Sequence, residues 1–334
     1  MAPGGALSWS DVADPDVGRG EVLVEVAAAA LNRADLMQRA GRYPPPPGAS
    51  EVMGLEIAGS VRSWGDGVDG WAAGDRVSAL LPGGGYAELA SVPADLLMPV
   101  PERLTLAEAA AVPEVFFTAY SALFLEGRAA PGETVLIHAG ASGVGTAAIQ
   151  LARRAGCRVI VTAGGPEKTA ACLRLGAELA IDYRSEDFEA RVREHLGDAV
   201  PRAHVGPGGA SGPGGVDVII DMVGKDYFDR NLRLLNVRGR LVFVAAQSGP
   251  DVPLSIYALT AKRLELIGAT LRARPLAEKV ALRDAFLERF GDDLASGRIA
   301  PVIDRTFRVE DVEDAHAHMA ANRNIGKIVL LVRE

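Results

Sequence analysis

The chain has 334 residues, more than one hydrophobic core usually holds, so we expect two domains. Hydrophobic residues make up 49% and charged residues 23%, which excludes a disordered chain. The net charge is −8 and the sequence has no basic cluster, so nothing in it indicates a surface that binds nucleic acid. The first ten residues lack a basic region followed by an apolar core, and no apolar run could span a bilayer, so we expect a cytoplasmic protein without membrane insertion.

The first third of the chain has the pattern of short strands separated by glycine and proline. Strands are predicted at residues 21–26, 54–64, 76–81 and 86–92, so this part should form a β-rich lobe. Tyr43 is followed directly by a rigid, extended run of four prolines. Thr105 and Glu108 have the spacing of a capping box and predict a helix that leads out of this lobe.

From residue 133 the pattern alternates between strand and helix. Strands are predicted at residues 134–138, 158–163, 179–181, 216–221 and 240–244, with helices between them. This alternation predicts an α/β fold with a parallel, doubly wound sheet. Residues 206–215, rich in glycine and proline, should form a surface loop, and residues 264–271 a further edge strand.

The last part of the chain is expected to return to the first lobe. A helix is predicted at residues 277–290, followed by strand, helix and strand patterns at residues 301–307, 310–321 and 327–332. We therefore expect one domain made of residues 1–112 and 257–334, and a second made of residues 113–256.

A glycine-rich turn follows the strand at residues 134–138. In Gly140-Ala-Ser-Gly143-Val-Gly145, the glycines allow close backbone approach, and the first N–H groups of the next helix favour a pyrophosphate. Such glycines can also serve packing alone, so the turn by itself leaves dinucleotide binding open. The alternating strands and helices downstream support the binding role.

The end of the second strand of this sheet bears on the choice of cofactor. A site for NAD carries Asp or Glu there, to accept a hydrogen bond from the ribose hydroxyl. Residues 161–168 have no acid at the strand tip, and Glu167 fits a partner of the helix dipole. Lys168 could reach a 2′-phosphate, so we expect NADPH; the alternative for Lys168 is a solvated helix lysine.

We expect no metal site. Cys157 and Cys172 are too few for a four-thiolate zinc site, and the histidines do not complete another ligand set. Without a Lewis acid, ketones and alcohols are poor substrates, whereas quinones and conjugated enones need less polarisation. The candidate donors of a proton or hydrogen bond are Tyr43 and Asn32, although a lone tyrosine often serves packing.

Three segments carry a more specific signal: residues 31–43 (LNRADLMQRAGRY), 54–56 (GLE) and 136–150 (LIHAGASGVGTAAIQ). Together they resemble the zinc-free quinone oxidoreductases of the medium-chain dehydrogenase/reductase superfamily, most of all the p53-inducible branch and its bacterial relatives. The resemblance continues through residues 322–329 and implies a GroES-like catalytic domain around a central Rossmann domain. Leu55 stands where a zinc-dependent relative carries a histidine ligand.

The resemblance also implies the residues of an NADPH site. The pyrophosphate would be held by Ser142, Gly143, Val144 and Gly145, the 2′-phosphate by Gly164, Lys168 and Tyr183, and the nicotinamide side by Thr118, Phe243, Val244 and Ala245, with Lys327 nearby. The chain departs from the pattern in three places. The usual first strand is short or absent before Trp9, the loop at residues 206–215 is long, and a second tyrosine before Tyr43 is missing.

Our leading hypothesis is an NADPH-dependent reductase of a small, quinone-like acceptor. An enoyl-thioester or enone reductase is an alternative, because residues 32–43 also resemble the tyrosine-bearing segment of mitochondrial enoyl reductases. A second alternative is an NADPH-binding protein with little turnover, as crystallin relatives of the family suggest. We expect a homodimer, because residues 264–271 alternate in character and could pair with the same edge of a second subunit.

Overall fold

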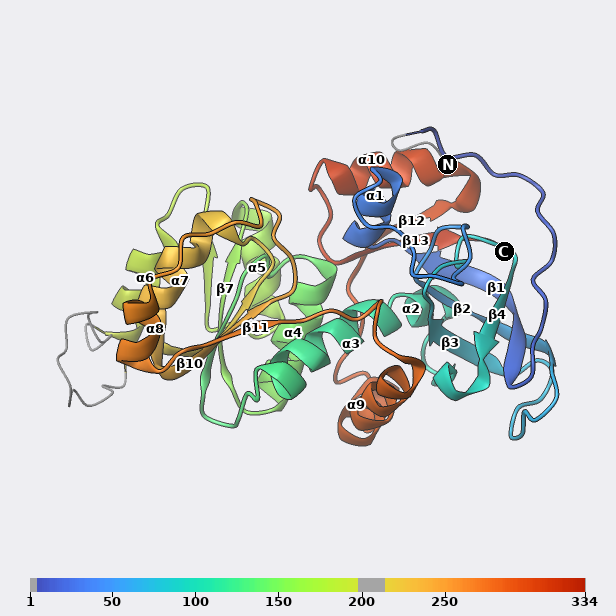
Figure 1. Ribbon diagram of the computed structural model, residues 1–334, viewed down its shortest axis with the longest axis horizontal. Helices are drawn as coiled ribbons and strands as arrows, with labels where there is room; N and C mark the ends of the chain where they lie inside the picture. The colour runs from blue at the N-terminus through green and yellow to red at the C-terminus, as the bar shows by residue number, and fades with distance from the viewer. Residues whose placement is uncertain (1–4, 198–213, 334) are drawn as a thin grey trace. The chain divides into compact units, whose positions relative to one another are not determined.

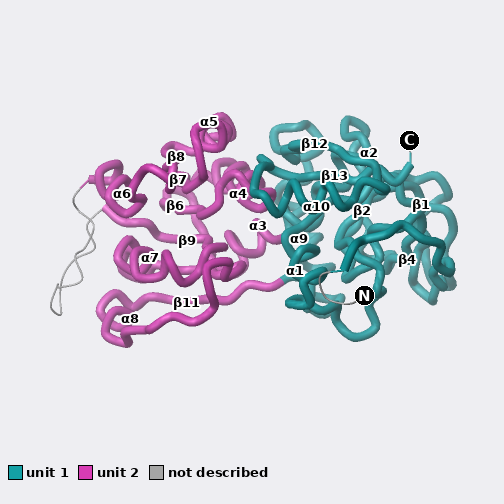
Figure 2. Tube along the Cα trace, turned by 90° about the horizontal axis from the view of Figure 1, so that it is seen from above, with its two compact units in different colours: residues 1–117, 271–334 teal, residues 118–270 magenta. Residues whose placement is uncertain are grey.

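The computed structural model describes residues 5–197 and 214–333 (Figure 1), so most of the predicted loop at residues 206–215 lies outside the described residues. The chain divides into two compact units (Figure 2). Unit 1 comprises residues 1–117 and 271–334, and unit 2 comprises residues 118–270. The division after residue 117 lies 5 residues beyond the boundary expected after residue 112, and the division after residue 270 lies 14 residues beyond the one expected after residue 256. The expected boundaries stay a prediction.

The sheet of unit 1 takes strands from both ends of the chain. Strand β1 (Glu21–Ala30) is central and pairs antiparallel with β2 (Glu56–Trp64), with β4 (Leu89–Pro93) and with the C-terminal β13 (Lys327–Leu331). The order is β12-β13-β1-β2-β3-β5, where β3 is Arg76–Leu80, β5 is Met98–Pro99 and β12 is Ile303–Arg308. No strand forms at residues 5–20, where the usual first strand was expected to be short or absent.

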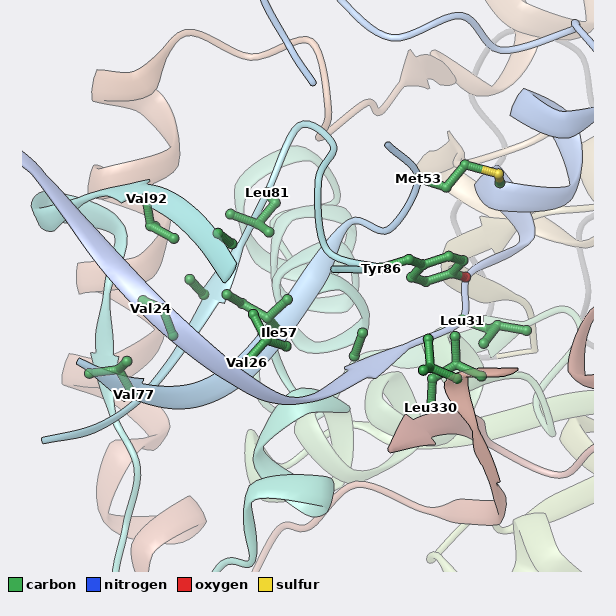
Figure 3. Close-up of a cluster of buried hydrophobic side chains, with 14 of the residues drawn as sticks. Val24, Val26, Leu31, Met53, Ile57, Val77, Leu81, Tyr86, Val92 and Leu330 are labelled. Atoms are coloured by element: carbon green, nitrogen blue, oxygen red, sulfur yellow. The ribbon is translucent and has the colours of Figure 1, made fainter. Parts of the chain in front are cut away.

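The core of unit 1 lies against this sheet. Inward side chains of β1 and β2, among them Val24, Val26 and Ile57, are fully buried and gather in one cluster (Figure 3). The other face of β1 is buried as well, because Ala28 and Ala30 belong to a second cluster with Ala58 of β2 and Ala109. Tyr86 belongs to the same cluster and brings a hydroxyl into it.

Helices complete unit 1. They are α1 (Arg33–Arg39), α2 (Leu106–Ala110), α9 (Leu276–Ser296) and α10 (Val312–Ala320), with 3-10 turns η1 (Ala94–Leu96) and η4 (Val309–Asp311). Helix α3 (Pro113–Tyr120) begins in unit 1 and ends in unit 2, since the division falls after Phe117. The predicted capping box is present at α2, where Glu108 N donates to Thr105 Oγ1 at 3.2 Å. Helix α1 was not predicted, because its seven residues are too few to show a clear period.

Unit 2 is built on six parallel strands, as predicted. Their order is β11-β10-β9-β6-β7-β8, which is the doubly wound Rossmann order with a switch point between β6 and β9. The strands are β6 (Thr134–Ile137), β7 (Arg158–Ala163), β8 (Leu179–Asp182), β9 (Val216–Asp221), β10 (Leu235–Phe243) and β11 (Glu265–Gly268). Residues 135–137 are fully buried, as a continuous apolar run in a parallel sheet requires.

The helices of unit 2 lie on both faces of its sheet (Figure 1). They are α4 (Gly143–Arg154), α5 (Pro166–Arg174), α6 (Phe188–Leu196), α7 (Phe228–Leu234) and α8 (Ile256–Lys262), with a π-helical turn η2 (Ser121–Glu126) and a 3-10 turn η3 (Lys225–Tyr227). Strand β10 begins at Leu235, earlier than the predicted residue 240. The reason is that Leu235 already pairs with Val216 of β9, ahead of a register irregularity between Leu235 and Arg240. Lys262 caps the end of α7 just before it, donating to Leu232 O, Arg233 O and Leu235 O at 3.0, 2.9 and 2.8 Å.

Candidate functional site

The glycine-rich turn of unit 2 presents free backbone donors at the switch point of the sheet. Ser142 is the N-cap of α4, and its Oγ accepts from Gly145 N at 3.0 Å. Within the described ranges, no acceptor is bonded to the N–H groups of Gly143 and Val144, the first two residues of the helix. These two amides, at the positive end of the helix dipole, therefore fit a pyrophosphate.

The glycines on either side have a packing role. A Cβ on Gly145 would lie 2.4 Å from Ala139 O, and one on Gly140 would lie 2.7 Å from Val161 Cβ. Neither position has room for a side chain, so α4 can approach β6 and β7 closely only because both residues are glycine. The packing explanation and the binding explanation of the glycine motif thus apply to different residues of the same turn.

The carboxyl end of β7 carries the residues expected around a 2′-phosphate. Gly164 follows the strand directly, and a Cβ there would lie 2.7 Å from Tyr183 Oη. Tyr183 is half exposed, and Lys168 lies in the first turn of α5. The structure thus brings Gly164, Tyr183 and the start of α5 together, and their contact with a cofactor stays a prediction.

A hollow lies at the carboxyl ends of β10 and β11. It has a volume of about 630 Å³, and its wall includes Phe243, Val244 and Ala245, the residues expected on the nicotinamide side. Val244 N donates to Asp221 O at 2.8 Å, which fixes the backbone where β10 ends. The size is within the range of sites for small molecules, so the hollow could take the nicotinamide end of a dinucleotide. Thr118 is half-buried on α3.

Unit 1 contains a buried ion pair that also holds Asn32. Lys327 Nζ donates to Glu56 Oε1 and to Asn32 Oδ1, both at 2.7 Å, and to Leu31 O at 2.5 Å. Asn32 Nδ2 donates to Glu56 Oε1 at 2.8 Å and to Ala30 O at 3.2 Å. All three N–H groups of Lys327 and both of Asn32 therefore have acceptors within the protein.

This arrangement bears on two expected roles. Asn32 was expected to donate a hydrogen bond to the acceptor, and Lys327 to lie against the cofactor; neither contact has been tested. With their donors engaged, both side chains are better placed to fix the start of α1 than to bind a ligand. Glu56 is fully buried, and its Oε2 also accepts from Glu114 N at 2.8 Å, at the start of α3.

A second buried group adjoins the first. Asp35 Oδ2 accepts from Asn32 N at 2.7 Å and from Tyr86 Oη at 3.0 Å, and burial raises the pKa of Asp35 to about 6. His316 lies edge-on to Tyr86, with ring centroids 6.1 Å apart, and burial lowers its pKa to about 4. His316 is therefore neutral near pH 7.

Tyr43 is half-buried beside Arg272. The Arg272 guanidinium lies 5.3 Å from the centre of the Tyr43 ring, and Nη1 donates to Tyr43 O at 3.3 Å. Nε donates to Pro82 O at 2.8 Å, and Nη2 donates to Gln38 Oε1 at 2.7 Å. Arg272 thus holds the ring and the backbone of Tyr43 in place.

Glu114 is the other titratable group of this region. It is half-buried, and burial, followed by the charge of Glu56, raises its pKa to about 8. Its carboxyl group is therefore mostly protonated at neutral pH. Sequence reasoning missed Glu114, Asp35 and Tyr86, because only the fold brings them to Glu56.

The described residues contain no group of three or more His, Cys, Asp and Glu side chains that could hold a metal ion. At the expected ligand position, Leu55 is buried, and the next residue, Glu56, is paired with Lys327. His318, which could have been a ligand, bonds Asp304 Oδ2 at 2.9 Å. In the same described part, no helix is long and apolar enough to cross a membrane.

Comparison with known proteins agrees with both units. Residues 18–102 match the alcohol dehydrogenase GroES-like domain, and residues 143–285 match the family described as zinc-binding dehydrogenase. A relative from mouse, quinone oxidoreductase, is 31% identical and covers 97% of this chain and 92% of its own length. A polyketide synthase subunit of Mycobacterium tuberculosis is 33% identical over 93% of this chain, which is 14% of that protein.

A solved structure shows the same architecture. The quinone oxidoreductase from Thermus thermophilus, determined alone and with NADPH, is 34% identical, has a TM-score of 0.80, and is matched over 98% of this chain and 97% of its own. The fold and these matches define a two-domain oxidoreductase of the medium-chain dehydrogenase/reductase superfamily. Within it, the chain belongs to the quinone oxidoreductase family. The finer likeness to the p53-inducible branch stays a prediction.

Proposed function

We propose that this protein is a metal-independent, NADPH-dependent quinone reductase that acts in the cytoplasm as a homodimer. The observation that carries the proposal is the likeness to quinone oxidoreductases over almost the whole chain, together with the two free amides at Gly143 and Val144. The cofactor, when bound, supplies a hydride to an electron-poor acceptor. The reduced quinone then takes a proton from water, so the part left to the chain is binding and orientation.

Different residues of unit 2 bind different parts of the cofactor. Gly143 and Val144 bind the pyrophosphate through their amides, and Ser142 holds the turn in shape by accepting from Gly145 N. The site of the 2′-phosphate, which distinguishes NADPH from NADH, is formed by Gly164, Tyr183 and Lys168. The hollow beside Val244 and Ala245 receives the nicotinamide end, with Phe243 in its wall. Thr118, on α3, is the further residue that we expect on the nicotinamide side.

In unit 1, Tyr43 orients the acceptor. The ring is held by Arg272, and the hydroxyl can donate a hydrogen bond to a carbonyl oxygen. We propose that Asn32 and Lys327 position the start of α1, which leads to Tyr43, rather than touching acceptor or cofactor. Their network with Glu56 fixes one end of this helix.

The decisive experiment measures NADPH oxidation against quinones, enones and enoyl thioesters side by side. Quinone turnover well above the other two supports the proposal. The second candidate, an enoyl reductase, is favoured by the polyketide synthase relative, and preferred turnover of enoyl thioesters would establish it instead. Stoichiometric NADPH binding without oxidation of any acceptor would point to a binding protein with little turnover.

A further inference from the structure

Arg184 covers the end of β7 together with Tyr183. A Cβ built on Gly164 would lie 3.1 Å from Arg184 Nε, and one on Gly165 would lie 3.5 Å from Arg184 Nη1. The guanidinium therefore lies over two consecutive residues that have no side chain. Gly164 and Gly165 have no side chains, yet both are buried.

The guanidinium has its donors available. The side chain of Arg184 makes no hydrogen bond or ion pair to any acceptor within residues 5–197 and 214–333. Asp182, two residues before Arg184, is engaged by backbone instead: its Oδ1 accepts from Gly165 N at 2.9 Å and from Arg184 N at 3.1 Å. The exposed guanidinium of Arg184 thus lies over Gly164 and Gly165, and no direct ion pair neutralises its charge.

The same contacts remove the backbone donors closest to the end of β7. Gly165 is the N-cap of α5, but its N–H is taken by Asp182, and the next residue, Pro166, has no N–H. At the turn after β6, by contrast, the amides of the first two helical residues are free. An anion that lies against Gly165 and Pro166 therefore needs donors from side chains.

We propose that Arg184 is a specificity-determining residue that binds the 2′-phosphate of NADPH through its guanidinium. The inference rests on NADPH as the cofactor of the proposed function and extends it. The planar fork of an arginine can donate two parallel hydrogen bonds to a phosphate, which a lysine cannot do. Tyr183 Oη also lies beside Gly164, and Lys168, in the first turn of α5, would supply a third donor.

The test compares dissociation constants of NADPH and NADH for Arg184→Met, whose side chain still covers Gly164 but carries no charge. A charged hydrogen bond to phosphate corresponds to about tenfold to a hundredfold in affinity, so NADPH should bind about tenfold or more weakly. NADH should bind within about twofold of the wild type, since it has no 2′-phosphate. Arg184→Lys should recover only part of the loss.

Two further variants set the scale. Arg174→Ala removes an exposed arginine from the last turn of α5 and should change neither constant. Lys168→Ala should weaken NADPH by a similar factor to Arg184→Met, because both cations face the same group. Raising the salt concentration should shrink the preference of the wild type for NADPH, because the pocket is exposed to solvent.

Equal losses for NADPH and NADH in Arg184→Met, or no loss, would overturn the inference. Adenosine 2′,5′-bisphosphate and 5′-AMP give the same comparison without the nicotinamide. The bisphosphate should lose affinity in Arg184→Met while 5′-AMP does not. Because these are binding measurements, they keep their meaning even if the quinone assay fails, so failure of the proposed function is separable from failure of this inference.

Discussion

The carboxylate of Glu56 and the ammonium of Lys327 lie 2.7 Å apart, and both side chains are almost fully buried. The pair joins β2 to the C-terminal strand β13 and also fixes the amide of Asn32. Removing one partner of such a pair leaves a charge buried without compensation. Loss of either side chain of the pair should therefore destabilise unit 1.

Lys327→Met should lower the stability of unit 1 by about 3–5 kcal/mol, measured as the shift of its urea unfolding transition. Glu56→Gln combined with Lys327→Met should recover part of the loss, because no charge then remains buried. Arg308→Ala is the control, since its pair with Glu310 is exposed and should contribute less than about 1 kcal/mol. Equal effects of Lys327→Met and Arg308→Ala would contradict the assignment.

Tyr43→Phe should lower quinone turnover by about tenfold or less, because an orienting hydroxyl contributes less than an essential proton donor. The substitution keeps the ring under Arg272 and the bond from Arg272 to Tyr43 O, so the local structure should persist. Steady-state kinetics with a quinone, alongside the NADPH dissociation constant, measures the effect. A hundredfold fall with unchanged NADPH affinity would make Tyr43 a proton donor and strengthen the enoyl-reductase alternative.

Glu114 should make the protein less stable as the pH rises from 6.5 to 8. Its folded pKa of about 8 lies above the unfolded value of about 4.5, so the folded state holds a proton that the unfolded state has released. That advantage is lost as the pH approaches 8. Asp35 also makes the protein less stable as the pH rises, between about pH 4 and pH 6. His316 makes it more stable as the pH rises, between about pH 4 and pH 6.5, so the effects of these two residues on stability largely cancel.

Thermal unfolding at a series of pH values tests this sign. The wild type should lose roughly 1–3 kcal/mol of stability between pH 6.5 and 8, and Glu114→Gln should show a much flatter profile. Glu102→Gln, at an exposed position of the same unit, should keep the slope of the wild type. A slope unchanged by Glu114→Gln would show that its carboxyl is ionised in the folded protein.

Activity should survive dialysis against a strong chelator. The reasons are the leucine at position 55 and the engagement of Glu56 by Lys327. Metal analysis of the purified protein should accompany the assay. Stoichiometric zinc together with loss of turnover on its removal would refute metal independence.

Light scattering at micromolar concentration should give the mass of a dimer. Strand β11 pairs only with β10 among the described strands, so its other edge has free backbone groups that a second copy could pair with. Dilution into the nanomolar range should reveal the dissociation constant. A monomer mass throughout would exclude this assembly.

Local pattern predicted most of the fold. The order of strands in unit 2 followed from alternating apolar runs and helices, and β7 and β9 have the predicted bounds. The glycine turn could be named from local pattern because it follows a strand whose end is a binding position in this fold, whereas Gly164 and Tyr183 were named from the resemblance to the family. What local pattern could not show is which N–H groups of the turn remain free.

The polar network of unit 1 could not be predicted. Glu56 and Lys327 come from distant parts of the chain, and nothing near either residue indicates the other. Asn32 was expected to donate to a ligand because its residue type permits it, but the fold directs its donors to Glu56 and Ala30. Arg184 was overlooked because a charged residue after a strand is usually solvated, and only the backbone of Gly164 and Gly165 shows what it covers.

The pairing of β1 with β13 has a consequence for how the protein is made. Because unit 2 is continuous in the chain, it can fold as it leaves the ribosome, whereas β1 must wait for the last strand to be synthesised. Until then the edge of β1 at residues 28–30 stays unpaired, which is a hazard for aggregation. A nascent chain stalled before residue 327 should therefore hold a folded unit 2 beside an incomplete unit 1 that depends on chaperones.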